Sequence, residues 1–312
     1  MKKDCLKFTV SPKKQFRVII NTDCKNEADD QFVVAHHLMT PKFDVRGIVA
    51  CHFETKGKEF GVGKTMEASY DEVQLVLKLM DLTGEYPVLR GAVGPMADES
   101  TPVDSEGARF IIEEAMREDD RPLFVAFQGA LTDLASALLL EPRIADRMTA
   151  IWIGGGAYPQ GGVEFNLKQD IPAANVVMAS RVPLWQVPAN AYKQVTVTLS
   201  ELQARVAPCG DLGAYLFQQM VDLNDRKADR LDWPHGESWC LGDQPTVSLL
   251  LDDQNNTCNY DILPAPRVAP DCSYIPQPDG RPIRVYHTVD ARMTLEDFYA
   301  KMHLFFPPKG NC

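Results

Sequence analysis

Three aspartates near the N-terminus are the residues of this chain best suited to chemistry. Asp23 closely follows an apolar run, Val18–Ile20, and Asp29 and Asp30 come soon afterwards, where a helical pattern begins. Carboxylates held this close repel one another unless a proton or a cation lies between them, and an all-oxygen cluster suits a hard cation such as Ca²⁺. A helix N-cap would account for Asp29 or Asp30 alone, but it does not explain Asp23.

Three later segments carry further polar groups at expected breaks between strand and helix. In segment 127–135 a glycine follows an apolar strand, and a backbone carbonyl at such a break can face a cation. Glu164, Phe165 and Asn166 offer an acid, a ring and an amide, which together suit a sugar. Asp243 precedes an apolar helix, where capping is an equally good explanation. Of the histidines, His52 and His235 are the ones expected near a cleft.

Between these segments, strand-like and helix-like patterns alternate along the first two thirds of the chain. Strands are expected at 17–21, 45–50, 87–89, 123–127, 150–154 and 183–187, and helices at 29–39, 65–83, 105–118, 130–140 and 171–180. This alternation predicts an α/β fold with a mostly parallel central sheet and helices on both faces. Ligands bind at the carboxyl ends of the strands in such sheets, which is where Asp23 lies.

From Thr198 onwards the pattern becomes helical, at 199–206 and 212–223. A polar, proline-rich stretch at 255–282 follows, and then a final strand at 282–289 and a helix at 294–305. No repeat or linker interrupts the chain, so a single domain over 1–312 with a helical C-terminal region is expected.

Composition excludes several classes of protein. The net charge of −11 argues against binding to a phosphate backbone, and no apolar run approaches the ~20 residues of a membrane span. The N-terminus lacks the apolar region of a signal peptide, so a cytoplasmic protein with reduced thiols is expected. The eight cysteines form no CxxC pair, and neither GxSxG nor HExxH occurs, which argues against serine hydrolases and zinc proteases.

In their order, these segments resemble the inosine-uridine-preferring nucleoside hydrolase family from about Arg17 to Phe305. The family's opening DxDPGxDD is similar to NTDCKNEADD at 21–30, and its GxLTNLA to GALTDLA at 129–135. Its EFNxxxDPEAA looks like EFNLKQDIPAA at 164–174, and its late HDP is matched by Gly242-Asp243 with Pro245 one place on. Each match alone is weak, but their joint order is specific.

The resemblance implies a nucleoside hydrolase-like fold and a calcium-dependent hydrolysis of the N-glycosidic bond of a ribonucleoside, which releases ribose and a free base. Asp23 would be a Ca²⁺ ligand and the base that accepts a proton from the attacking water. Asp30, Asp243 and the backbone carbonyl of Gln128 would complete the ligands. Asp29, Glu164 and Asn166 would hold sugar hydroxyls. Beyond the resemblance, His52, Phe165 and Trp239 are further candidates to contact the substrate. The family is commonly oligomeric, so a homo-oligomer is expected, with no nucleic acid or membrane partner.

The chain also departs from the family pattern. Asn21 replaces the first acid of DxD, and the inserted residues bring Lys25 and Glu27 near the site. Gly242 replaces the late histidine, so the base specificity is expected to be non-standard. Candidates to contact or protonate the leaving group are Trp239, Tyr158, His235 and Glu237. Two alternatives stay open: a hydrolase of another ribosyl conjugate or glycoside, and a non-catalytic protein that binds a nucleoside or sugar.

Overall fold

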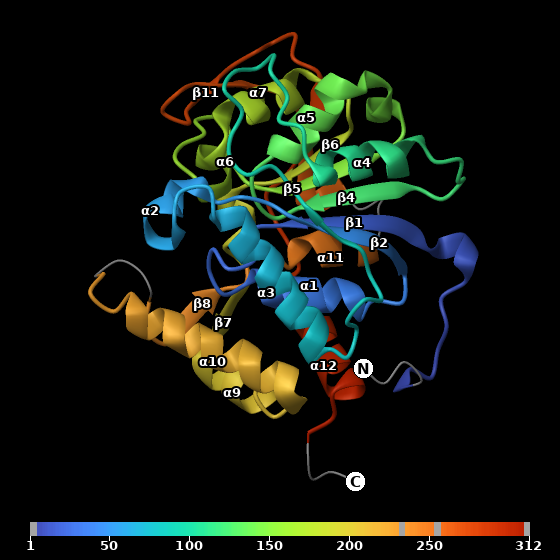
Figure 1. Ribbon diagram of the computed structural model, residues 1–312, viewed down its shortest axis with the longest axis vertical. Helices are drawn as coiled ribbons and strands as arrows, with labels where there is room; N and C mark the ends of the chain where they lie inside the picture. Colours follow the sequence, from blue (N-terminus) through green and yellow to red (C-terminus); the bar gives the residue numbers. More distant parts are fainter. Residues whose placement is uncertain (1–4, 231–234, 253–256, 309–312) are drawn as a thin grey trace.

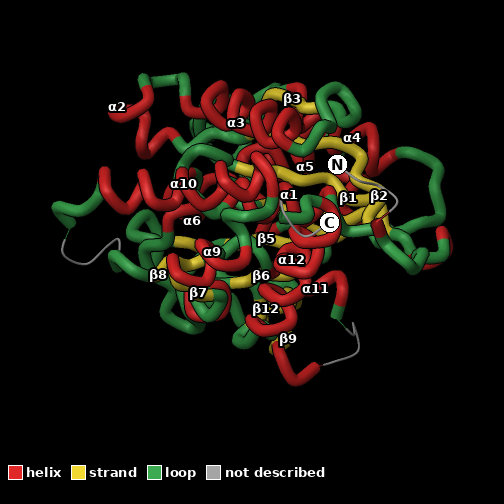
Figure 2. The backbone as a smooth tube through the Cα atoms, turned by 90° about the horizontal axis from the view of Figure 1, so that it is seen from below, coloured by secondary structure: helices red, strands yellow, loops and turns green. Residues whose placement is uncertain are grey.

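An eight-stranded sheet runs through the middle of the molecule (Figure 1), in the order β3-β2-β1-β4-β5-β6-β12-β9. Figure 2 follows this order from β3 at one end of the sheet to β9 at the other. The computed structural model describes residues 5–230, 235–252 and 257–308. The strands are β1 (Phe16–Thr22), β2 (Phe43–Ala50), β3 (Val88–Arg90), β4 (Leu123–Phe127), β5 (Thr149–Ile153), β6 (Leu184–Val187), β9 (Tyr260–Pro264) and β12 (Pro282–Tyr286). Neighbouring strands are parallel except β9, which is antiparallel to β12.

Helices cover both faces of this sheet (Figure 1). On one face lie α1 (Asp30–Leu38), α3 (Thr65–Leu79), α11 (Pro245–Leu251) and α12 (Ala291–Phe305), and on the other α4 (Glu106–Met116), α5 (Thr132–Leu140) and α7 (Ile171–Ala179). Val18 and Ile20 of β1 pack in the first layer and Ile19 in the second. A strand buried on both faces needs apolar residues at successive positions, which explains the unbroken run Val18–Ile20.

The centre of the sheet is a topological switch point. From β1 the chain adds β2 and β3 on one side, and it later adds β4, β5 and β6 on the other. The connections that leave β1 and β4 therefore diverge and open a crevice at the carboxyl ends of these strands, the usual position of ligands in this architecture. Asp23 directly follows β1, and Gln128 directly follows β4.

The C-terminal part supplies a second wall next to this crevice. Helices α9 (Leu199–Arg205) and α10 (Gly210–Arg226) lie beyond α3, farther from the sheet (Figure 1). A small antiparallel pair, β7 (Thr196–Thr198) and β8 (Ser238–Cys240), lies beside them. The sequence patterns predicted the helices of this region but not the β7–β8 pair, because such short strands pair across about forty residues of intervening chain and leave no local periodicity.

The predicted α/β class, with a mostly parallel sheet and helices on both faces, is confirmed. No strand was expected in the polar, proline-rich stretch at 255–282. The structure places β9 there, together with the short antiparallel pair β10 (Arg267–Val268) and β11 (Tyr274–Ile275). Shorter helices are α2 (Gly57–Phe60), α6 (Phe165–Gln169) and α8 (Ala189–Tyr192), with 3₁₀ turns η2 (Pro12–Lys14), η3 (Glu54–Lys56), η4 (Pro142–Asp146) and η5 (Thr257–Asn259). Over the described parts of the chain, no helix has the length and apolar character needed to cross a bilayer.

Candidate functional site

A cavity of about 860 Å³ lies at the carboxyl ends of the central strands. Its walls come from the segments that follow β1, β4, β5 and β6 and from the region around β8. It brings together most of the residues predicted for the site, namely Asp23, Asp29, Asp30, Gln128, Glu164, Phe165, Asn166, His235, Trp239 and Asp243. His52, Tyr158 and Glu237 are not among the lining residues.

Three carboxylates form the tightest cluster in the cavity. One carboxylate oxygen each of Asp29, Asp30 and Asp243 lies within 4.8 Å of the other two. Asp243 is separated from the other two by more than two hundred residues of chain and reaches them because α11 packs against α1. The predicted ligand set contained Asp23 in place of Asp29, so the structure adds Asp29 to the candidate cation ligands.

The capping interpretation of these aspartates does not describe their contacts. Asp29 occupies the N-cap position of α1, but its side chain makes no capping hydrogen bond; instead its Oδ2 accepts the Gly242 N–H at 3.1 Å. The N-cap of α11 is Gln244, and Asp243 contributes its backbone carbonyl, which accepts the Thr246 N–H and hydroxyl. The carboxylate of Asp243 is therefore left to face the cavity.

Asp23 is the most isolated of the four aspartates in terms of hydrogen bonds. Its side chain is 1% exposed, and within the described chain neither carboxylate oxygen accepts a bond from any donor. Its close neighbour is the carboxylate of Asp30, which also accepts the Thr22 hydroxyl. Two ionised carboxylates share no hydrogen, so only a proton or a cation can join them.

Burial and mutual repulsion both disfavour ionisation of this cluster. Burial raises the pKa of Asp23, Asp29, Asp30 and Asp243 well above the ordinary value, and the charges of neighbouring carboxylates raise it further. For Asp23 the positive charge of Lys56 acts in the opposite direction. A site that raises the pKa of four carboxyl groups is strongly organised for positive charge.

The predicted sugar-binding residues Glu164 and Asn166 are held firmly by the backbone around them. Glu164 caps α6, accepts the N–H groups of Asn166 and Leu167, and also accepts the N–H of Gly155, whose φ of 87° suits glycine. Asn166 Nδ2 donates to the carbonyls of Gln128 at 3.1 Å and Ile153 at 2.9 Å. Asn166 therefore has its amide oxygen left for a ligand, whereas much of the acceptor capacity of Glu164 is already used.

Tyr192, Asn26 and Lys56 also line the cavity, although the sequence patterns did not single out Tyr192 or Asn26. The Tyr192 hydroxyl donates to Glu164 at 3.1 Å. Lys56 Nζ donates to Asn26 and lies 4.7 Å from the centre of the Phe165 ring. Asn26 belongs to the inserted residues after Asp23. This departure from the family pattern was the feature of the sequence that could have indicated that Asn26 lines the cavity.

Other predicted residues lie elsewhere. His52 is fully buried, and its Nε2 pairs with the Thr132 hydroxyl at 2.8 Å; burial lowers its pKa to about 4. Tyr158 donates to Gln186. Lys25, expected near the site with Glu27, pairs instead with Glu72 at 2.8 Å, whereas Glu27 does line the cavity. The structure thus does not bring His52, Tyr158 or Lys25 to the site, because each is directed to a partner in the surrounding packing.

Comparisons with known proteins agree with this geometry. The family described as inosine-uridine preferring nucleoside hydrolase matches residues 18–296. The chain is 30% identical over 139 residues to the pyrimidine-specific ribonucleoside hydrolase RihB of Escherichia coli, a match over 43% of this chain and 44% of that protein. It is also 30% identical over 138 residues to the inosine-uridine preferring nucleoside hydrolase of Leishmania major, with the same coverage. The matched region thus spans less than half the length of these two relatives.

Solved structures share the fold over nearly the full chain. The purine-preferring ribonucleoside hydrolase from Gardnerella vaginalis superposes with a TM-score of 0.72 at 17% identity, covering 93% of this chain and 99% of that one. An inosine-guanosine nucleoside hydrolase superposes with a TM-score of 0.68 at 17% identity, again over 93% of this chain and 99% of the other.

Proposed function

This chain belongs to the inosine-uridine preferring nucleoside hydrolase family, and we propose that it hydrolyses the N-glycosidic bond of a ribonucleoside, with Ca²⁺ as its cofactor. The observation that carries the proposal is the buried Asp23, whose oxygens lack donors, beside the clustered Asp29, Asp30 and Asp243. Such a cluster is costly to keep unless positive charge occupies it, both from a cation and from a substrate that becomes positive as it reacts.

The donor set fits a hard divalent cation. All candidate ligands are oxygens, which Ca²⁺ prefers. We assign Asp23, Asp30, Asp243 and the Gln128 carbonyl to the cation, because both oxygens of Asp23 lack any other partner, whereas Asp29 already accepts the Gly242 N–H. The Gln128 carbonyl accepts one bond, from Asn166, and a carbonyl has a second lone pair. When bound, the cation offsets the repulsion of the carboxylates and makes the attacking water more acidic.

The side chains around the cation site transfer the proton and hold the sugar. Asp23 accepts the proton of the attacking water, since it is an unpaired base at the floor of the cavity. Asp29 and the amide oxygen of Asn166 hold sugar hydroxyls, with Tyr192 and Glu164 as a supporting pair. The sugar becomes oxocarbenium-like as the bond to the base breaks, and the surrounding carboxylates stabilise that charge.

The departing base faces the outer wall of the cavity, where Phe165, Trp239 and His235 lie. Trp239 is 2% exposed and belongs to β8, so it forms a fixed part of the wall. His235 is exposed at the mouth, whereas Glu237 is exposed and does not line the cavity. We therefore retain His235, and not Glu237, as the proposed proton donor on the leaving-group side.

A panel of ribonucleosides and p-nitrophenyl riboside tests this function, with free ribose measured in Ca²⁺ and again after chelation. We expect release that chelation abolishes and Ca²⁺ restores. We also expect faster hydrolysis of the p-nitrophenyl compound, since its leaving group needs no proton. Tight binding of ribosides without any ribose release would identify a binding protein instead. Release that survives complete chelation would contradict the assigned cofactor.

A further inference from the structure

Four basic side chains line the outer part of the same cavity. They are Lys56 at the end of η3, Lys193 after α8, Lys227 after α10 and Arg230. Lys193 and Arg230 are exposed and the other two are half-buried, whereas Asp23, Asp30 and Asp243 are buried at the floor. The same lining also holds seven acidic residues, so the four bases stand out by their position in the outer part of the cavity and not by their number.

Two of these bases are held in place by neighbouring groups. Lys56 Nζ donates to the Asn26 carbonyl at 2.9 Å and to its Oδ1 at 2.5 Å, above the Phe165 ring. Lys227 pairs with Glu59 at 3.0 Å, and its side chain is 22% exposed. Bases positioned this way lose little conformational freedom when they bind a ligand.

The four bases line the same cavity as the carboxylate of Glu27. Burial raises the pKa of Glu27, and the charges of Lys56, Arg230, Lys193 and Lys227 oppose that rise. Glu27 forms no hydrogen bond or ion pair within the described chain, although it lines the cavity. All four positive charges therefore act on the same part of the cavity and favour an anion there.

Compensation of the acidic floor does not account for these bases. The largest charge effects on Asp29, Asp30 and Asp243 come from other carboxylates, and only Asp23 is strongly influenced by one of the bases, Lys56. Lys193 and Arg230 are also exposed, whereas Asp23, Asp30 and Asp243 are buried, so the positive charge of the bases is directed at a different part of the ligand.

We propose that this basic ring, Lys56, Lys193, Lys227 and Arg230, binds an anionic group of the substrate on the side facing away from the aspartates. The inference rests on the proposed function and names its substrate class, a ribosyl compound that carries a phosphate or a carboxylate. Charge-assisted hydrogen bonds to such a group are stronger than those to a neutral hydroxyl. The anion comes either from a phosphate on the sugar or from an acid group on the leaving base.

Three compounds that share the ribose and the pyrimidine ring distinguish these sources: uridine, uridine 5′-monophosphate and orotidine. We expect kcat/KM for one charged compound to exceed that for uridine by roughly tenfold or more at low salt. The preference should fall as ionic strength rises, because salt screens the outer charges. Preference for the monophosphate places the anion on the sugar, and preference for orotidine places it on the base.

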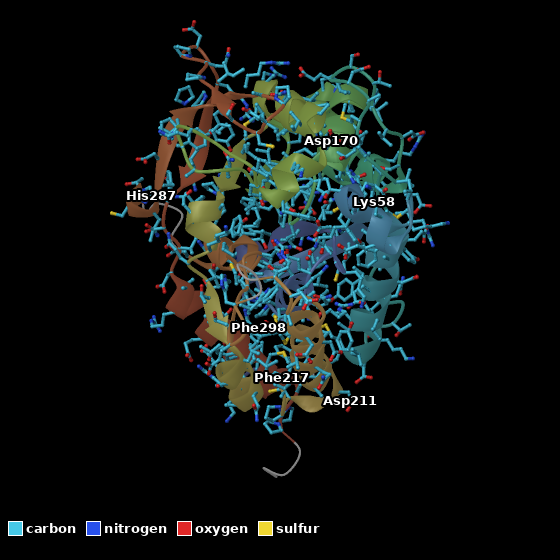
Figure 3. All side chains as sticks on the ribbon, turned by 90° about the vertical axis from the view of Figure 1, so that its left-hand side faces the viewer. Lys58, Asp170, Asp211, Phe217, His287 and Phe298 are labelled. Atoms are coloured by element: carbon cyan, nitrogen blue, oxygen red, sulfur yellow. The ribbon has the colours of Figure 1, made fainter. Side chains whose placement is uncertain are left out.

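Paired variants tie the preference to the ring. Lys193→Gln should reduce the preference for the charged compound by roughly fivefold, through the loss of one charged contact. Glu27→Gln should increase it, because a competing negative charge is removed. Lys58→Gln is the matched control: Lys58 is exposed, lies on the outside of the molecule (Figure 3), does not line the cavity, and should leave the preference unchanged.

The inference fails if uridine is used at least as well as both charged compounds, or if Lys193→Gln slows all three equally. If none of the three is hydrolysed, the proposed function is judged on the wider panel of ribosides, and calorimetry decides the inference separately. The dissociation constants of the same three compounds then take the place of kcat/KM, and equal values for charged and neutral compounds overturn it.

Discussion

At the scale of single residues, a buried amide–carboxylate pair supports the floor of the site. Asn21 Nδ2 donates to Asp133 Oδ2 at 3.1 Å, while Asp133 Oδ1 accepts the Ser105 hydroxyl at 2.7 Å and the Ala92 N–H at 2.9 Å. The family patterns have an acid at the first position and an amide at the second, whereas this chain has the reverse. The departure at Asn21 is therefore matched by an opposite departure at Asp133, the residue to which Asn21 donates.

This exchange predicts a rescue. Asn21→Asp should destabilise the protein by about 1–3 kcal/mol, because it places two acceptors opposite each other in a buried site. Asp133→Asn added to it should recover most of the loss, since the amide introduced at position 133 can donate to the carboxylate introduced at position 21. Urea unfolding of both single variants and the double variant gives the coupling energy. Additive losses in the double variant would show that the two side chains do not act as a pair.

Asp23 is the residue on which turnover should depend most. Asp23→Asn keeps the shape of the side chain but removes the base and one charged oxygen, so kcat should fall roughly 10²–10⁴-fold. The folded protein should persist, because the change relieves repulsion with Asp30. Circular dichroism and the rate on p-nitrophenyl riboside check both points. Near-normal kcat in a correctly folded variant would remove Asp23 from the mechanism.

At the scale of elements, α12 is tied to α1, which begins at Asp30, and through His36 to Gln244 at the start of α11. His36 of α1 pairs through Nδ1 with Gln244 Oε1 at 2.5 Å and through Nε2 with Asp297 of α12 at 2.9 Å. Gln244 adjoins Asp243, and Asp297 also accepts from the buried Lys301. Burial acts to raise the pKa of Asp297, but the bond from His36 and the charge of Lys301 lower it to about 2.

Breaking this connection should therefore cost stability. Asp297→Ala leaves the ammonium of Lys301 buried without its carboxylate, which should reduce the free energy of unfolding by about 2–4 kcal/mol. The matched control is Glu296→Ala in the same helix, whose exposed pair with Arg205 is screened by water and should contribute much less. Because the folded-state pKa of Asp297 is lowered, its contribution is present above the unfolded pKa and is lost as pH falls. Equal losses in the two variants by urea unfolding would contradict a stabilising role for this connection.

At the scale of the whole molecule, the carboxylate cluster makes stability depend on pH and on the cation. The folded pKa of Asp243 is raised, so without a cation the folded state binds more protons than the unfolded chain, and stability falls as pH rises through the folded pKa. Asp243→Asn removes the titrating carboxyl group, and with it this loss of stability at higher pH. In chelator, the variant should therefore gain stability relative to the wild type as pH rises.

Calcium should reverse that order, because the wild type binds it more tightly than the variant and ligand binding stabilises the folded state. Thermal unfolding of both proteins at several pH values, with chelator and with Ca²⁺, measures the difference directly. The buried histidines change protonation equally in both proteins and cancel in the comparison. A difference between the two that is independent of pH and of Ca²⁺ would argue against the cluster as the cation site.

The sequence by itself determined the features that depend on neighbours along the chain. The run Val18–Ile20 predicted β1, the spacing of apolar residues predicted α3, and their alternation predicted the mostly parallel sheet. Asp23, Asp29 and Asp30 are close in the chain, so their meeting at one strand end followed from the position of β1 alone. The resemblance gave Asp243 and the Gln128 carbonyl their predicted role as cation ligands, and both residues line the cavity.

The tertiary structure decided which side chains turn towards the cavity and which turn away from it. His52 follows a strand end, as Asp23 does, yet Thr132 and the surrounding packing hold it inside the fold. Tyr192 and Lys193 line the site together with Trp239 and Cys240 of β8, which pairs with β7 although the two segments share no local pattern. Hydrophobic periodicity reports the face of an element that is buried. The direction of a polar side chain depends on partners distant in sequence, and these are set only when the elements pack.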